Sequence, residues 1–172
     1  MAKINKHYVL TSVALAVIGG VSAALIGLTN LVTKDKIKQN EIEKVSRGIV
    51  TIFGDDSKIF EEKELSDYKY VNYVYTIKDN GDNYLGYAYR TTGSNDYGKI
   101  SLLVGFDYSS QAFKKMVVIV NEQTYASTLE DNYIDPVNSG DRNVTDTSCG
   151  ATYGAKLIEA MINEASEAVK AN

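Results

Sequence analysis

The chain has 172 residues, enough for one modest domain and one appended element. Its formal net charge is −4 and no basic stripe runs along it, so a nucleic-acid partner is not expected. The single cysteine, Cys149, cannot hold an iron–sulfur cluster alone, and the sequence contains no P-loop, Ser-His-Asp arrangement or zinc-ligand spacing.

The first predicted element is an apolar helix. Tyr8 to Val32 contains no charged residue, and as a helix it would be roughly 37 Å long, against a hydrocarbon core of about 30 Å. This length predicts a single-pass transmembrane anchor. The alternative is a cleaved signal peptide, because Val21-Ser22-Ala23 fits a small-residue cleavage site; the apolar run continues past that point, which favours the anchor.

The lysines that flank this span bear on its orientation. Lys3 and Lys6 precede it, and Lys34, Lys36 and Lys38 follow it. Counted by the positive-inside bias, these charges lean toward placing the C-terminal part inside the cell.

An amphipathic helix is predicted next, over residues 34–53, with Gly54 as its stop. The chain then changes to short runs rich in Val, Ile, Leu and Tyr, separated by turn-forming residues. These runs predict an antiparallel sheet of about four strands, typical of a small α+β domain: Val71 to Ile77, Tyr84 to Arg90, Ile100 to Phe106 and Met116 to Val120.

A longer irregular stretch, Asn121 to Asp146, is expected to lead into a closing helix over Ala155 to Lys170. The predicted organisation is therefore a tail and transmembrane anchor (residues 1–33), a connecting helix (34–54) and one domain (55–172). The fold class is α+β: one N-terminal transmembrane helix, a small antiparallel sheet and a C-terminal helix.

The most informative stretch lies at the start of the closing helix. It runs Asp146-Thr147-Ser148-Cys149-Gly150-Ala151-Thr152-Tyr153 and places a threonine hydroxyl at the mouth of a helix. The amides of Tyr153, Gly154 and Ala155 are expected to lie unpaired in the first turn, where they suit a phosphate group on Thr152. The alternative is that Thr147-Ser148 only cap a helix and Gly150 relaxes a turn.

These residues carry a family resemblance. Asp146-x-x-Cys149-Gly150-Ala151-Thr152 resembles the D-x-x-S-G-A-T signature of the FMN-binding domain family found in the RnfG protein of Rnf complexes and the NqrC protein of Nqr complexes, with Cys149 where serine is usual. Of the two, this short chain is more similar to RnfG. The resemblance implies that Thr152 carries FMN through a phosphoester bond, installed by a flavin transferase. It also places Asp146, Cys149, Gly150 and Ala151 around the cofactor.

Two further contacts are expected from the same family. A segment of the form E-T-P-G-x-G lies against the flavin there. Its candidate here is Glu122-Gln123-Thr124-Tyr125-Ala126, in which Glu122 and Thr124 match. Tyr153 adjoins the attachment residue and either covers a flavin ring or packs on the start of the closing helix.

The resemblance implies an electron-transfer subunit that works within a membrane-bound, ion-translocating ferredoxin:NAD oxidoreductase of the Rnf type and is not a catalyst alone. Its partners would be other membrane and iron–sulfur subunits. The flavin domain of such a subunit faces outward from the cell membrane, opposite to the lysine count. Two alternatives stay open: a stand-alone extracytoplasmic flavinylated carrier, and a membrane-anchored binding or structural domain without flavin.

Overall fold

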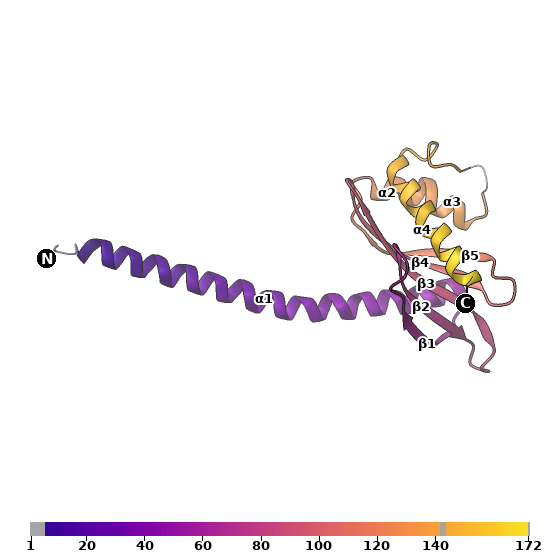
Figure 1. Cartoon of the computed structure of the whole chain (residues 1–172), viewed down its shortest axis with the longest axis horizontal. Helices are drawn as coiled ribbons and strands as arrows, with labels where there is room; N and C mark the ends of the chain where they lie inside the picture. The colour runs from indigo at the N-terminus through magenta and orange to yellow at the C-terminus, as the bar shows by residue number, and fades with distance from the viewer. Residues whose placement is uncertain (1–5, 142–143, 172) are drawn as a thin grey trace. The chain divides into compact units, whose positions relative to one another are not determined.

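The computed structural model describes residues 6–141 and 144–171 (Figure 1). Side chains are described for all of these except residues 6–9, 26–35, 37 and 38. The chain divides into two compact units, Met1–Ile42 and Glu43–Asn172. The boundaries predicted at residues 33 and 54 stay predictions.

One helix, α1 (Lys6–Phe53), covers the predicted anchor and the predicted connecting helix. It ends where the sequence predicts, because Gly54 adopts a φ of +102° that an L-residue rarely takes, and its amide donates to the Val50 carbonyl at 2.8 Å. A glycine in this conformation just after a helix is a frequent C-terminal stop.

The predicted transmembrane span, Tyr8 to Val32, lies partly outside the residues with described side chains. Within the part of the chain that the structure does describe, no helix has both the length and the apolar character needed to cross a membrane. The described stretch from Leu10 to Leu25 is shorter than the ~20 apolar residues of a typical spanning helix. The transmembrane helix is therefore not found among the described residues.

The second unit is built on a five-stranded antiparallel sheet in which each strand pairs with the next along the chain (Figure 1). This confirms the α+β class with a C-terminal helix. The strands are β1 (Lys58–Glu64), β2 (Val71–Lys78), β3 (Tyr84–Asn95), β4 (Gly98–Asp107) and β5 (Phe113–Asn121).

The sheet is covered on both faces. On one face, Val45, Ile49 and Ile52 from the last turns of α1 form a buried cluster with residues such as Leu103 of β4. On the other, α4 (Thr152–Lys170) packs its buried side into a larger cluster that includes Ile158. Strand β4 is consequently buried along nearly its whole length, as a central strand with two covered faces should be.

The stretch predicted as irregular, Asn121 to Asp146, contains helical structure. It forms α2 (Ala126–Leu129), a π-helical turn η1 (Glu130–Ile134) and α3 (Asp135–Asn138) in direct succession. The prediction was wrong here because a π turn shifts the buried side by one position, which breaks the 3.6-residue periodicity that identifies a helix from sequence.

Candidate functional site

The candidate site is the start of α4. Thr152 is the first helical residue, and Ala151 precedes it in a non-helical conformation. No side chain caps this helix end within the described residues. The first intrahelical bond runs from the Ala155 amide to the Ala151 carbonyl at 3.0 Å, so the expectation of an unpaired Ala155 amide was wrong. The amides that precede this bond belong to Thr152, Tyr153 and Gly154.

The loop before the helix is held by its own side chains. The Ser148 hydroxyl accepts from the Thr145 amide and lies within 3.2 Å of the Thr145 hydroxyl. Thr147 likewise contacts Thr145, at 3.1 Å between their hydroxyls. Thr147 and Ser148 therefore stabilise this turn, and they do not cap α4.

Cys149 is buried, and its thiol forms hydrogen bonds with backbone groups on both sides of it. Its thiol donates to the Asp146 carbonyl at 3.3 Å, and its sulfur accepts from the Ala151 amide at 3.4 Å. A serine hydroxyl makes the same two kinds of bond, which explains why cysteine substitutes here for the serine of the resembling signature.

An ion pair from Asp146 links the loop to the helix. Its carboxylate lies 3.6 Å from the Lys156 ammonium, one turn into α4. Gly150 allows the backbone to turn between Asp146 and Thr152, because its φ of +77° lies in the left-handed region. Each residue that the motif singles out from 146 to 152 thus has a defined place at the helix start.

A cavity of about 210 Å³ lies beside these residues. Its wall combines the residues at the start of α4 with side chains from two distant segments. They are Tyr97, Gln123, Tyr125, Leu129, Gly150, Ala151, Thr152, Tyr153 and Gly154.

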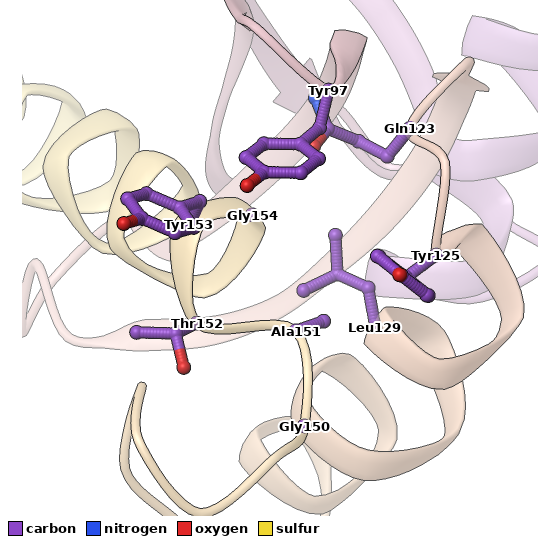
Figure 2. Close-up of a pocket in the computed structure, with 9 residues that line it drawn as sticks. All are labelled: Tyr97, Gln123, Tyr125, Leu129, Gly150, Ala151, Thr152, Tyr153 and Gly154. Carbon is purple, nitrogen blue, oxygen red and sulfur yellow. The ribbon is translucent and has the colours of Figure 1, made fainter.

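Figure 2 shows how the lining residues are arranged. The rings of Tyr97 and Tyr153 stack with 5.2 Å between centroids and 22° between their planes (Figure 2). Tyr125 and Leu129 lie across from this pair, and Thr152 lies near Tyr153 and Ala151. The cavity is thus bounded by aromatic and aliphatic groups, as sites for planar organic ligands commonly are.

The segment expected to lie against a flavin, residues 122–126, reaches the wall of this cavity. Gln123 and Tyr125 line it, whereas Glu122 and Thr124 do not. The Thr124 amide and hydroxyl both donate to the Tyr97 carbonyl, at 2.8 and 3.2 Å. The flavin contacts predicted for Glu122 and Thr124 stay predictions.

Tyr133 lies close to the motif loop and has a perturbed hydroxyl. Burial raises its pKa to about 12, and the negative charges of Glu159, Cys149 and Asp146 when ionised act in the same direction. The phenol therefore stays neutral over the physiological range.

Sequence reasoning missed Tyr97 and Leu129, and it named Gln123 and Tyr125 only as members of the candidate segment 122–126. The separator predicted at Gly93-Ser94-Asn95 lies inside β3, and the real turn is Asp96-Tyr97, between the paired residues Asn95 and Gly98. Gly98 has a φ of +131°, and a Cβ there would overlap the Glu122 carbonyl. This glycine was the available signal for a tight turn close to residue 97.

Fold and site together define a small α+β domain, preceded by a long helix, with an aromatic-lined cavity at the start of its final helix. Residues 1–50 match the family model described as the RnfG N-terminal region. The match supports an RnfG-like family, and it suggests a subunit of an Rnf-type complex that takes part in electron transport beside other subunits. A search of curated proteins finds no match to the chain.

Proposed function

We propose that this protein is an electron-transfer subunit of an Rnf-type ion-translocating ferredoxin:NAD oxidoreductase, and that it carries FMN in phosphoester linkage to Thr152. Two separate parts of the chain support the proposal. The N-terminal 50 residues match the RnfG N-terminal region, and residues 146–152 resemble the attachment signature.

One structural observation carries the site assignment: the half-buried Thr152 lies at an uncapped helix start, on the wall of an aromatic-lined cavity. A helix start binds phosphate through its free amides and the positive end of its dipole. The adjoining cavity offers apolar and aromatic surface to a ring system. The residues present therefore fit a phosphate-linked flavin.

Attachment by a flavin transferase would use FAD. The Thr152 oxygen forms a bond to the FMN phosphorus, the phosphoanhydride P–O bond breaks, AMP leaves and the hydroxyl proton passes to solvent. The amides of Thr152, Tyr153 and Gly154 would then hold the phosphate. The Asp146–Lys156 pair would keep the loop against the helix. When bound, FMN supplies the capacity to accept and pass on electrons.

The test of attachment is coexpression with a flavin transferase. The protein should gain one FMN by mass and fluoresce in a denaturing gel, and Thr152→Ala should abolish both signals. Thr147→Ala is the matched control, because Thr147 is an exposed threonine of the same loop. Flavin retained in Thr152→Ala would move the site elsewhere, and an unlabelled wild-type protein would favour a binding or structural domain without flavin.

We further propose that the protein is held at the cell membrane with its C-terminal domain outside. The outward orientation rests on the resemblance to the RnfG-type family. The uncharged sequence from Tyr8 to Val32 supports the membrane location, as does the exposure of the large apolar side chains described there. These side chains are 55–70% exposed: Leu10, Val13, Leu15, Val17, Ile18, Val21 and Leu25.

The location can be tested with an impermeant protease. Intact cells or spheroplasts should lose the C-terminal domain. Digestion only after lysis would show that Lys34, Lys36 and Lys38 had determined the orientation. Copurification with iron–sulfur and multi-span membrane subunits would support the complex over a stand-alone carrier.

A further inference from the structure

Tyr97 and Tyr153 bring two aromatic rings together from distant parts of the chain. Tyr97 lies in the turn between β3 and β4, and Tyr153 is the second residue of α4. Their rings stack, yet both remain open to solvent, with exposed fractions of 39% and 63%. An exposed aromatic pair leaves apolar surface available to a ligand.

The Asn95 side chain forms hydrogen bonds with the backbone of both tyrosines. The Asn95 amide nitrogen donates to the Tyr153 carbonyl at 3.1 Å, and its oxygen accepts from the Tyr97 amide at 2.9 Å. Asn95 thereby links the β3–β4 turn to the first turn of α4 through both ends of one carboxamide.

Asn95 is itself held by a buried group. The Gln123 amide nitrogen donates to the Asn95 oxygen at 3.1 Å and also to the Gly98 carbonyl. Gln123 is only 7% exposed, so this support is shielded from water. With the two bonds from Thr124 to the Tyr97 carbonyl, the backbone beneath both rings is fixed, and only the rings face outward. A rigid frame that presents aromatic rings loses little entropy when a ligand binds.

We propose that the Tyr97–Tyr153 pair is the surface on which the flavin ring of Thr152-linked FMN stacks, and that Asn95 is the positioning residue that holds the two rings in register. The proposal rests on the proposed function of Thr152. The adjacency of Tyr153 to the attachment residue and the shared cavity wall support it. The exposed face of a stacked pair suits a planar aromatic ligand.

The readout is the fluorescence of the flavin in the folded protein. A tyrosine ring in contact with excited flavin gives up one electron, which reduces the flavin, and the electron then returns to the oxidised tyrosine. The cycle has no net chemistry and quenches emission. Flavin that stacks on the pair should therefore have a short emission lifetime in the folded protein, and a long one after the protein is unfolded in urea.

Three variants test the assignment in the full chain, each labelled by coexpression with the transferase. Tyr97→Leu and Tyr153→Leu should each lengthen the folded-state lifetime toward the unfolded value. Asn95→Asp keeps the acceptor for the Tyr97 amide and removes the donor to Tyr153, so it should also lengthen the lifetime although both rings are still present. A role confined to folding would lower stability without changing the lifetime of the fraction that stays folded.

Tyr108→Leu is the matched control. Tyr108 is 40% exposed and also belongs to a stacked tyrosine pair, with Tyr84 at 4.6 Å between centroids, but it does not line this cavity. Its removal should leave the lifetime unchanged.

The outcomes separate this inference from the proposed function. If the wild-type protein takes no FMN on Thr152, the proposed function fails, and this inference fails with it. If FMN is attached but Tyr97→Leu and Asn95→Asp have the wild-type lifetime, only the stacking assignment is overturned. An equal effect of Tyr108→Leu would also overturn it, because the quenching would then not come from this pair.

Discussion

At the scale of single residues, Gly150 determines how the chain enters α4. Its φ of +77° is strained for a residue with a side chain, whereas the space around it is open. A Cβ at this position would meet its nearest neighbour, the Thr128 methyl group, at 3.5 Å, which is ordinary van der Waals contact. The glycine is therefore required by the backbone conformation and not by crowding.

Replacement of Gly150 should accordingly depend on backbone preference. Gly150→Val should lower the free energy of unfolding by about 1–2 kcal/mol, because β-branched residues resist the left-handed conformation. It should also reduce FMN incorporation, since Thr152 is two residues away. Gly150→Asn is the control. Asparagine tolerates this conformation, so this variant should lose less stability and less FMN incorporation than Gly150→Val. Urea denaturation and flavin mass measure the two effects; equal behaviour of Val and Asn would refute the backbone argument.

Tyr133 gives the protein a predicted sensitivity to alkaline pH. Its pKa is raised from 10.0 to about 12 by burial first and by nearby negative charge second. The folded state therefore holds this proton more tightly than the unfolded state does. The resulting stability is fully present below pH 10 and should be lost as the pH rises toward 12. Tyr133→Phe should flatten that part of the stability curve, as measured by urea denaturation across the pH series.

A matching Tyr125→Phe variant should leave the slope unchanged, because Tyr125 is exposed. Burial also raises the pKa of Tyr75 to about 12, so ultraviolet difference spectra of Tyr133→Phe should show a smaller late-ionising signal and not its complete loss. A late-ionising signal of wild-type size in Tyr133→Phe would contradict the assignment to Tyr133.

The residues of the site differ in how well they can be predicted from the sequence. Thr152 and Gly150 stand in a short motif, so their neighbourhood follows from local chain geometry. Tyr97 reaches the same cavity only because β3 is long enough to bring its turn to α4. Such a meeting depends on strand length and register, which local patterns specify poorly.

At the scale of elements, α3 covers the free edge of β5 at one residue, Met116. The Asn138 carboxamide accepts from the Met116 amide at 2.8 Å and donates to the Met116 carbonyl at 2.9 Å. It thus forms the two bonds that a neighbouring strand would form. Covering an edge in this way prevents pairing with another chain.

Removal of the Asn138 amide should expose that edge. Asn138→Ala should cost about 1–3 kcal/mol of stability, because Met116 is buried and its backbone groups lose their partners. Hydrogen exchange at the Met116 amide should accelerate. Ser139→Ala is the neighbouring control, since its exposed hydroxyl bonds only within α3. No change in exchange at Met116 would show that the carboxamide does not protect the edge.

The elements that the sequence predicted well are those with a strong apolar pattern. β2 to β5, the end of α1 at Phe53 and the closing helix follow from alternation or helical periodicity. β1 was missed because all seven of its residues are exposed and five are charged. Such a composition suits an edge strand, but it lacks the apolar alternation by which strands are predicted.

At the scale of the whole molecule, the second unit begins within α1, at Glu43. The last turns of this helix cover one face of the sheet, and Val45, Ile49 and Ile52 are each less than 9% exposed there. Burying each such side chain contributes about 1.5–3 kcal/mol. Three of them together approach the whole net stability of a typical domain, about 5–15 kcal/mol.

Truncation should therefore have two different outcomes. A fragment of residues 43–172 should fold, because it retains the helix turns that cover the sheet, and with the transferase it should still accept FMN on Thr152. A fragment of residues 55–172 should aggregate or remain unfolded, because the apolar face around Leu103 loses its cover. Circular dichroism and urea denaturation distinguish the two fragments.

Point variants in the full chain check the same argument without truncation. Ile49→Ala should cost about 2–5 kcal/mol, as large-to-small changes in a packed core do. Val50→Ala, one residue along the same helix, is the control. Val50 is 37% exposed, so this variant should lower the free energy of unfolding much less. If residues 55–172 fold as well as residues 43–172, or if the two point variants cost the same, the end of α1 is dispensable to the sheet. The folding unit then begins after Gly54.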